Sequence, residues 1–452
     1  MKALFGTDGI RGEAGQFPLD LATVTTIGFS LASHLAASGA QPKIVVGRDT
    51  RESGASIEEA LIDGATRAGA ECLSAGVITT PGVAFVTRKE EASAGVVISA
   101  SHNPYHDNGI KIFAPSGRKM DDAVERLIEA DVYNHIEVPA DVTGQSHSSA
   151  AAEEQLREEY LAFLADEIGD GLDLKGLTIV ADCANGASSA LAPTLFERLG
   201  AKVIAINATP DGRNINLNCG SLHIDSLREH VVKDKADLGV AFDGDADRSL
   251  FVDGEGNFVD GDATLLALAS HLQSHGKLKG DVAVATVMSN IGLEIALRAA
   301  GIRLVRTDVG DKYVLEELLR LGASLGGEQS GHIILPSLSL AGDGMITTLC
   351  LLRALSESRK TLAEITAGFK RYPQILLNVR VREKVPFSEL APVQAEVKEV
   401  EELLSLHGRL LLRYSGTEPL ARVMIEGEDQ RQIDEYAKRI AQAIEREIGA
   451  AV

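Results

Sequence analysis

The sequence has few positive charges and no long apolar run. It contains 44 Lys and Arg residues against 65 Asp and Glu in 452 residues, a formal net charge of −21. So acidic a chain disfavours nonspecific binding to nucleic acid or to an anionic membrane. No run of about 18 apolar residues, the length of a membrane-spanning helix, occurs. An anionic substrate would need a locally basic site within this acidic chain.

Cysteine is also scarce. The four residues Cys72, Cys183, Cys219 and Cys350 are far apart and form no Cys-X-X-Cys pair. This spacing favours buried or incidental thiols in a reducing compartment over disulfides or a zinc site. The first residues, MKALFGTDGIRGE, lack the apolar segment of a secretory signal. We therefore expect a cytoplasmic protein.

Short β-like runs alternate with amphipathic helical stretches over most of the chain, beginning with strand candidates such as Lys43–Gly47, Gly95–Ile98 and Leu177–Ala181. This alternation is typical of α/β layers with largely parallel pairing. From about residue 373 the pattern changes to alternating apolar and polar residues, followed by an amphipathic helix at Gln430–Ile448. The last part of the chain is therefore expected to be α+β.

Length and pattern together predict three similar α/β domains with mixed, largely parallel sheets, plus a small C-terminal α+β domain. At roughly 100–200 residues per domain, the chain is long enough for three or four domains. The expected boundaries are 1–152, 153–258, 259–371 and 372–452. Near the end of the first lies a stretch with Pro, Gly and Ser, Val138–Ala150, which we interpret as a linker.

A polar segment, Ser99-Ala-Ser-His-Asn-Pro104, directly follows the apolar run at 95–98. Ligands of open α/β sheets usually bind at such strand ends. Ser101 is a candidate nucleophile, and His102 and Lys111 are candidate acid–base or electrostatic groups. A simple polar turn explains the residue types equally well. No Gly-X-Ser-X-Gly elbow occurs, which disfavours an α/β-hydrolase.

Three aspartates at alternate positions, Asp243, Asp245 and Asp247, follow another apolar run. Carboxylates this close repel one another unless a cation neutralises them, and hard oxygen ligands favour Mg²⁺ or Ca²⁺. An EF-hand is excluded because Arg248 and Gly254 stand where its loop needs Gly and Glu. The alternative is an acidic turn in solvent.

A basic segment near the C-terminus, Arg413-Tyr-Ser-Gly-Thr-Glu-Pro419, is followed closely by Arg422. Its glycine and hydroxyls can donate hydrogen bonds to a phosphate, and arginines add bidentate, charge-assisted donors. An ordinary β-turn is the alternative. No Gly-X₄-Gly-Lys-Ser/Thr loop occurs, so use of a nucleoside triphosphate is not indicated.

Three glycine-containing segments carry weaker signals. Gly326–His332 offers a carboxyl and a hydroxyl to sugar hydroxyls or an amine, and Phe5–Gly12 places Arg11 among glycines. Gly47–Arg51 is similar and weaker still. Taken singly, each is compatible with a tight turn.

Taken together and in order, the motifs resemble those of the α-D-phosphohexomutase superfamily. They are FGTDGIRG at 5–12, SASHNP at 99–104, DGDADR at 243–248, GEQSGH at 327–332 and RYSGTEP at 413–419. Thr7 and Gln329 stand where the phosphomannomutase/phosphoglucomutase branch usually has the tyrosine of YDIRG and the methionine of GEMSGH. The resemblance is therefore closest to the amino-sugar branch.

The resemblance implies that the four domains surround a central cleft. From the first domain to the fourth, they would carry the phosphoserine, the metal, the sugar-binding loop and a phosphate-binding loop. It implies an isomerase that interconverts glucosamine 6-phosphate and glucosamine 1-phosphate through glucosamine 1,6-bisphosphate. That reaction feeds UDP-N-acetylglucosamine and cell-wall synthesis. The implied partner is this small phosphosugar, without nucleic acid or membrane, and a homodimer is one option for the oligomeric state.

The resemblance also implies a role for each motif residue. Ser101 would be phosphorylated, and one Mg²⁺ would bind its phosphate together with Asp243, Asp245 and Asp247. Transfer would be assisted by Arg11, His102, Lys111, Arg248 and His332, with either Lys111 or His102 as the proton carrier. The sugar and its second phosphate would be bound by Glu328, Ser330, Arg413, Ser415, Gly416, Thr417 and Arg422.

Two other functions use the same residues. A phosphatase would use the phosphoserine and admit water, and a phosphoglucomutase or phosphomannomutase would differ in the sugar. A non-catalytic sugar-phosphate sensor would have a degraded nucleophile or metal loop. It is disfavoured because Ser101 and all three aspartates are present.

Overall fold

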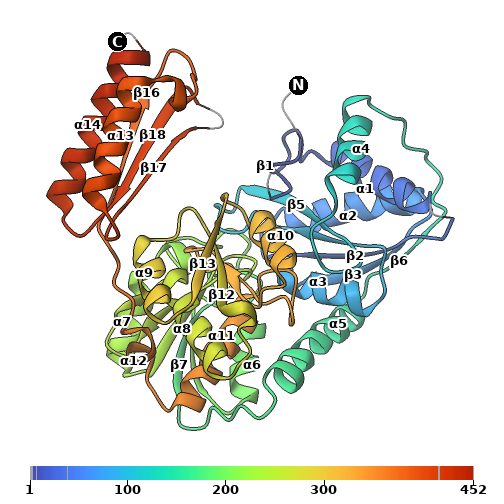
Figure 1. Ribbon diagram of the computed structural model, residues 1–452. Helices are drawn as coiled ribbons and strands as arrows, with labels where there is room; N and C mark the ends of the chain where they lie inside the picture. Colours follow the sequence, from blue (N-terminus) through green and yellow to red (C-terminus); the bar gives the residue numbers. More distant parts are fainter. Residues whose placement is uncertain (1–3, 7, 38, 416–417, 451–452) are drawn as a thin grey trace. The chain divides into compact units, whose positions relative to one another are not determined.

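The computed structural model describes residues 4–6, 8–37, 39–415 and 418–450. The chain divides into two compact units, Met1–Met288 with Val305–Thr366, and Ser289–Leu304 with Ala367–Val452. Figure 1 gives the order of the elements along the chain. Within the described ranges, every helix is too short or too polar to cross a membrane.

The first sheet has six strands in the order β1-β5-β4-β2-β3-β6. The strands are β1 (Ile10–Glu13), β2 (Lys43–Arg48), β3 (Glu71–Val77), β4 (Ala94–Ile98), β5 (Asp107–Phe113) and β6 (Gln145–His147). Strands β2, β3, β4 and β6 are parallel, whereas β5 runs antiparallel to β4 and β1. Because β6 lies within 138–150, the interpretation of that stretch as a plain linker is wrong.

Helices cover both faces of this sheet. Apolar side chains of α1 (Leu21–Ala36), α2 (Gly54–Arg67) and α4 (Asp122–Tyr133) form one core with the strands. On the other face lies α3 (Thr80–Lys89), so close that a Cβ at Gly95 would be 2.1 Å from Thr87 Oγ1. A helix, α5 (Ala150–Ala162), and a π-helical turn, Phe163–Ile168, lead to the next sheet.

The second sheet has five strands in the order β11-β10-β9-β7-β8. The strands are β7 (Thr178–Asp182), β8 (Lys202–Ile206), β9 (Leu238–Phe242), β10 (Ser249–Asp253) and β11 (Phe258–Val259), with helices α6 (Leu191–Arg198) and α7 (Asp225–Asp234) and a 3₁₀ turn at Gly220–Leu222. Every residue of β9 and β10 is buried. The turn between these two antiparallel strands is thus held firmly at both ends.

The third sheet has four strands in the order β13-β12-β14-β15. The strands are β12 (Val282–Thr286), β13 (Arg303–Thr307), β14 (Gly326–Gly327) and β15 (Ile333–Ile334), with a 3₁₀ turn at Lys279–Asp281 and helices α8 (Gly261–Ser274), α10 (Asp311–Leu321), α11 (Gly344–Ser358) and α12 (Leu362–Thr366). Aspartates cap two of the helices. Asp260 accepts from the Ala263 amide at the start of α8, and Asp343 accepts from the Met345 and Ile346 amides at the start of α11.

The second unit contains a three-stranded antiparallel sheet in the order β16-β18-β17. Its elements are α9 (Ile291–Ala299), β16 (Gln374–Arg380), a 3₁₀ turn at Phe387–Glu389, α13 (Ala391–Leu404), β17 (Arg409–Tyr414), β18 (Leu420–Glu426) and α14 (Gln430–Ile448). Apolar residues of α13 and α14 pack on one face of the sheet. The bounds of α14 match the helix predicted from the sequence.

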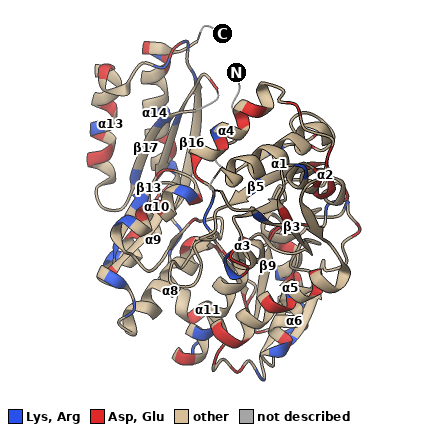
Figure 2. Cartoon of the chain, turned by 90° about the vertical axis from the view of Figure 1, so that its right-hand side faces the viewer, with Lys and Arg blue, Asp and Glu red and all other residues tan. Residues whose placement is uncertain are grey.

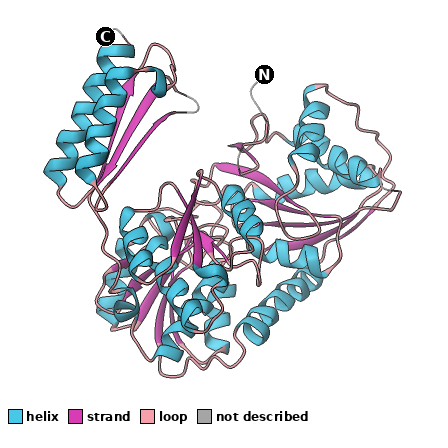
Figure 3. Ribbon diagram, viewed as in Figure 1, coloured by secondary structure: helices cyan, strands magenta, loops and turns pink. Residues whose placement is uncertain are grey.

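Three mixed sheets layered with helices and a small C-terminal α+β sheet confirm the predicted fold class (Figure 3). Many charged residues lie on helices and loops (Figure 2), and strands β4, β9 and β12 contain none. Lys111, in the middle of β5, is both charged and buried. A buried charge needs partners, and those partners mark the candidate site.

Candidate active site

Ser101 lies in the loop between β4 and β5, in a left-handed backbone conformation with φ of 51°. Its amide donates to Ser99 Oγ at 2.9 Å. Arg51 Nη2 donates to the carbonyls of Ser101 and Asn103, at 3.3 and 2.5 Å. Asn216 Nδ2 donates to the same two carbonyls, at 2.9 and 3.0 Å. Side chains from three segments thus fix this strained turn.

The supporting arginine is itself held in place. Arg51 is fully buried and forms an ion pair with Asp49, which also accepts from Ser99 Oγ at 2.6 Å. Burial raises the pKa of Asp49, and the Arg51 charge opposes this shift. The segment Gly47–Arg51, the weakest motif in the sequence, therefore supports the Ser101 loop.

The Ser101 hydroxyl points at an aspartate. It donates to Asp243 Oδ2 at 2.6 Å and lies 3.3 Å from His102 Nδ1. Arg248 Nη1 also lies 3.3 Å from His102 Nδ1, and since a guanidinium only donates, that nitrogen must accept. Burial, Arg248 and Arg11 lower the pKa of His102 to about 4. The imidazole beside Ser101 is therefore neutral, with its proton on Nε2.

The three predicted aspartates converge. Asp243, Asp245 and Asp247 lie in the turn between β9 and β10, and each offers a carboxylate oxygen within 4.8 Å of the others. All three are buried. Asp245 Oδ1 is buried without a hydrogen-bond partner among the described residues. Burial and the charges of Asp247 and Asp245 raise the pKa of Asp243. Three buried carboxylates with an unsatisfied oxygen fit a hard divalent cation.

Lys111 lies against this group. Its Nζ is 2.9 Å from Asp245 Oδ2, 3.4 Å from Asp247 Oδ2 and 3.3 Å from Asp8 Oδ2. Burial would lower the pKa of Lys111, but the charges of Asp245, Asp8 and Asp247 outweigh it and raise the pKa well above its usual value. Thr80 Oγ1 also donates to Asp245 Oδ2, at 2.6 Å. Lys111 is thus a fixed positive charge.

Arg11, in β1, forms an ion pair with Asp8 and reaches the serine loop. Its Nη1 lies 3.4 Å from Asn103 Oδ1 and 3.5 Å from the Ala100 carbonyl. Together with Arg248, Arg11 lines a cavity of about 480 Å³ whose other residues include Asp247, Glu328 and His332. Two arginines on the wall of an open cavity are suited to binding the oxygens of a phosphate.

Two residues of the predicted sugar loop, Glu328 and His332, line the same cavity. Glu328 Oε1 accepts from the Gly310 amide at 3.2 Å, and Ser330 Oγ donates to Glu328 Oε2 at 3.2 Å. His332 Nδ1 lies 3.7 Å from Asp247, and its Nε2 lies 3.9 Å from Asp311. Burial opposes protonation of His332, but Asp247, Asp311 and Glu328 raise its pKa to about 9.

The predicted phosphate loop lies in the other compact unit. Arg413 and Arg422 are direct cross-strand partners on β17 and β18, although like charges in this position repel. Arg422 Nη2 lies 3.4 Å from Ser415 Oγ and 3.4 Å from Glu418. Lys384 donates to the Ser415 carbonyl at 2.6 Å. An anion would relieve the repulsion. The predicted ligands Gly416 and Thr417 lie outside the described residues.

Four family models cover nearly the whole chain. They are alpha/beta/alpha domains I, II and III of phosphoglucomutase/phosphomannomutase, at residues 2–138, 158–256 and 260–372, and the C-terminal domain, at 376–443. The chain belongs to this phosphohexomutase family. It is therefore an isomerase of the phosphohexomutase type.

Two curated relatives match the phosphohexomutase chain over almost its full length. Phosphoglucosamine mutase of Solibacter usitatus is 52% identical over 99% of both chains. Phosphoglucosamine mutase of Koribacter versatilis is 47% identical, over 99% of this chain and 98% of its own.

Solved structures share the fold at low sequence identity. A phosphoglucomutase/phosphomannomutase family protein from Burkholderia thailandensis has a TM-score of 0.81 at 23% identity, over 99% of this chain and 98% of its own. N-acetylphosphoglucosamine mutase of Aspergillus fumigatus has a TM-score of 0.64 at 19% identity, over 98% and 95%.

Sequence reasoning missed several residues of the candidate site. Asp8 lies within a quoted motif but was not singled out, and Thr80 and Asn216 lie outside every motif. Lys119 bridges Asp8 and Asp311, at 2.6 and 2.7 Å from their carboxylates. Nothing in the local sequence marks Thr80, Lys119 or Asn216, because each contacts a segment more than 100 positions away.

Proposed function

We propose that this enzyme interconverts glucosamine 6-phosphate and glucosamine 1-phosphate through a phosphorylated Ser101. The observation that carries the proposal is the Ser101 hydroxyl, held at 2.6 Å from a carboxylate of a buried aspartate triad. The choice of amino sugar is supported by full-length relatives at 47 to 52% identity that bear the name phosphoglucosamine mutase.

The proposed reaction has two phosphoryl transfers. The C1 hydroxyl of glucosamine 6-phosphate attacks the phosphorus of phospho-Ser101, the P–Oγ bond breaks, and glucosamine 1,6-bisphosphate forms. The bisphosphate then turns around. Ser101 Oγ attacks the phosphorus at C6, which restores the phosphoserine and leaves glucosamine 1-phosphate. The proton lost by the attacking hydroxyl in each step is returned to the leaving oxygen, so the enzyme is unchanged.

Asp243, Asp245 and Asp247, with an oxygen of phospho-Ser101, would hold one Mg²⁺ per chain. The ion would neutralise charge on the phosphoryl group during transfer. Ser101 Oγ lies 2.6 Å from Asp243 Oδ2. A phosphate on this hydroxyl would therefore place further oxygen atoms beside the three aspartates.

Cationic side chains would stabilise the same charge. Lys111 and His332 are buried beside the aspartates, Arg248 is partly buried there, and ion pairing raises the pKa of each. Arg11 on the cavity wall would bind a phosphoryl oxygen. Because Lys111 is protonated, it would serve as a proton donor, whereas neutral His102 would serve as an acceptor. Lys111 and His102 are thus the two alternatives for the proton carrier.

Substrate binding would use the remaining predicted residues. Glu328 and Ser330, already hydrogen-bonded to each other, would bind sugar hydroxyls or the amine. Arg413, Ser415, Gly416, Thr417 and Arg422 would bind the phosphate that is not reacting. Binding energy from that remote phosphate can be used to orient the reacting end in both half-reactions.

A substrate comparison tests this proposal. Activity is measured as kcat/KM for the 6-phosphates of glucosamine, glucose and mannose, with inorganic phosphate followed in parallel. The proposal predicts the highest kcat/KM for glucosamine 6-phosphate and isomer formation without stoichiometric phosphate release. A preference for glucose or mannose phosphate would assign the enzyme to the other branch, and steady phosphate release would make it a phosphatase. We further propose that the enzyme acts in the cytoplasm.

A further inference from the structure

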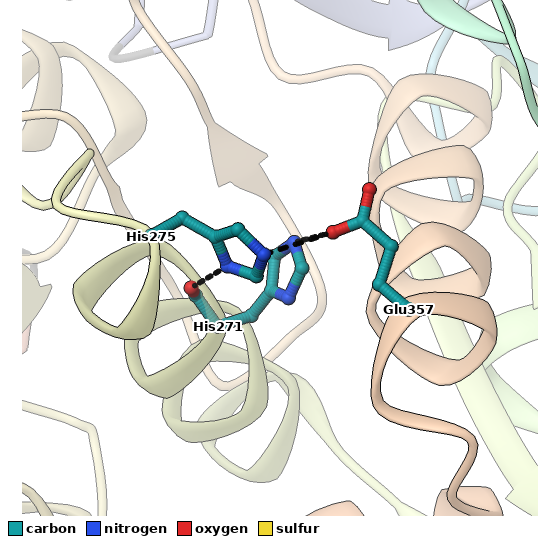
Figure 4. A group of neighbouring side chains, drawn as sticks. All are labelled: His271, His275 and Glu357. Carbon is teal, nitrogen blue, oxygen red and sulfur yellow. Dashed lines mark hydrogen bonds and ion pairs between the residues drawn. The ribbon is translucent and has the colours of Figure 1, made fainter.

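Two histidines and a glutamate form a polar cluster that the proposed reaction does not use. His271 and His275 are one turn apart at the C-terminal end of α8, and both face Glu357 in the last turn of α11 (Figure 4). Nε2 of His275 lies 3.2 Å from Glu357 Oε2, and Nε2 of His271 lies 3.5 Å from the same oxygen. Their side chains are 42, 16 and 41% exposed for His275, His271 and Glu357, so the cluster is open to solvent.

The tautomer of His275 leaves a lone pair facing the glutamate. Nδ1 of His275 lies 2.8 Å from the backbone carbonyl of His271. A carbonyl only accepts hydrogen bonds, so Nδ1 must carry a proton. In the neutral imidazole, Nε2 is then an acceptor and faces the Glu357 carboxylate, which is also an acceptor. Two facing acceptors need a proton or a cation between them. A histidine Nδ1–H donated to a carbonyl is the usual support of a metal ligand bound through Nε2.

The distances match a small tetrahedral ion. With metal–ligand bonds of about 2.0–2.1 Å, the donor atoms of a tetrahedral site lie about 3.3 Å apart. The two histidine-to-glutamate distances, 3.2 and 3.5 Å, bracket that value. One ligand atom from each of the three residues lies within 4.8 Å of the others. Small side-chain rotations would therefore bring the ligand nitrogens of the two histidines to the same separation. A water molecule would be the fourth ligand.

The electrostatic setting also favours a cation. The exposed carbonyls at the C-terminal ends of α8 and α11 carry partial negative charge. Arg353 Nη1 lies 3.9 Å from Glu357 Oε1, which leaves Oε2 directed at the histidines.

We propose that His271, His275 and Glu357 form a second metal site, which binds Zn²⁺ and links the C-terminal end of α8 to that of α11. Two imidazoles and one carboxylate are a borderline-soft ligand set that suits Zn²⁺, whereas Mg²⁺ prefers oxygen ligands alone. The site is thereby chemically distinct from the aspartate triad. Because Zn²⁺ would bind the folded protein, it would raise the unfolding temperature.

The test uses full-length protein freed of metal by a chelator and returned to saturating Mg²⁺, so that the aspartate triad is filled. Zn²⁺ binding is measured by calorimetric titration at pH 7.5, and Co²⁺ absorption reports tetrahedral coordination. His275→Gln removes one ligand and Glu357→Gln another. His230→Gln is the matched control, because His230 pairs with Asp234 at 3.1 Å across one turn of α7 but lacks a second histidine.

The proposal predicts one Zn²⁺ per wild-type chain, an affinity at least about tenfold lower in His275→Gln and Glu357→Gln, and no change in His230→Gln. The Zn²⁺-dependent rise in unfolding temperature and the visible Co²⁺ bands should be lost in the same two variants. Isomerase activity with Mg²⁺ alone should equal that of wild type in all three. Equal Zn²⁺ affinity in wild type and His275→Gln would overturn the proposal, as would an equal loss in His230→Gln.

Discussion

The Ser101 loop and the Arg413–Arg422 loop both belong to the proposed reaction, yet they are built differently. Ser101 is buried, and its loop is held by Arg51, Asn216 and Ser99. Arg413 and Arg422 are half-exposed cross-strand partners on β17 and β18, and like charges in this position repel. The contrast indicates that the protein pre-organises Ser101. The Arg413–Arg422 loop, in comparison, places two like charges together; Glu418 lies 3.4 Å from Arg422, and an added anion would relieve the repulsion further.

The largest expected effect is loss of the nucleophile. Ser101→Ala removes the hydroxyl that would carry the phosphoryl group, and kcat should fall by about 10³-fold or more. Steady-state kinetics of isomer formation checks this result. Ser116→Ala, at an exposed serine in the turn that follows β5, is the matched control and should retain full activity. Normal turnover in Ser101→Ala would show that Ser101 does not carry the phosphoryl group. The proposed difference in role between the two loops would then be wrong.

A slightly smaller fall in kcat is expected from a substitution in the aspartate triad, Asp243, Asp245 and Asp247. Asp245→Asn removes one of three clustered carboxylate charges, weakens Mg²⁺ binding, and leaves Lys111 with one ion-pair partner fewer. We expect kcat to fall by about 10²-fold or more at ordinary Mg²⁺ concentrations, with partial rescue at high Mg²⁺. A variant with unchanged kcat and Mg²⁺ dependence would show that the triad is not the metal site.

A substitution in the Arg413–Arg422 loop should raise KM rather than lower kcat. Arg422→Gln removes a charge-assisted contact to phosphate worth about 1.5–3 kcal/mol, equivalent to an increase in KM of about 10- to 100-fold. Activity across a range of substrate concentrations separates the two parameters. Arg431→Gln, at an exposed arginine of the same unit, is the control. A fall in kcat alone would mean that this loop acts on the chemical step.

The smallest effect concerns support of the serine loop. Asn216→Ala removes the two hydrogen bonds to the Ser101 and Asn103 carbonyls, both of which Arg51 still contacts. We expect kcat to fall about three- to tenfold, with KM little changed, since a neutral hydrogen bond is worth about 1 kcal/mol. A change in KM without a change in kcat would argue against pre-organisation of the nucleophile.

The sequence predicted the parts of the site that lie within single segments. The three aspartates fall in one turn, so their convergence is a local property. The fold class followed from the alternation of apolar runs and helical periods, and the helix expected at about Gln430–Ile448 is α14. These features depend on short-range patterns, which a sequence displays directly.

Long-range contacts were not predictable in this way. The 2.6 Å hydrogen bond from Ser101 to Asp243 joins residues 142 positions apart, and the support from Asn216 spans 115. Strand β6 was missed because its three residues, Gln145–His147, are all exposed and polar. Its strand conformation comes from pairing with β3, not from its own composition.

The central claim is that Ser101 carries the phosphoryl group. Following a labelled phosphoryl group from the enzyme to the sugar tests this claim most directly. The purified enzyme is labelled with radioactive glucose 1,6-bisphosphate, freed of ligand, and mapped by peptide mass spectrometry. The account predicts one labelled phosphate, on Ser101. It transfers to C1 of added glucosamine 6-phosphate, passes through the bisphosphate, and is found in glucosamine 1-phosphate after a single turnover. Label on another residue, or label on Ser101 that stays on the protein while isomer forms, would contradict it.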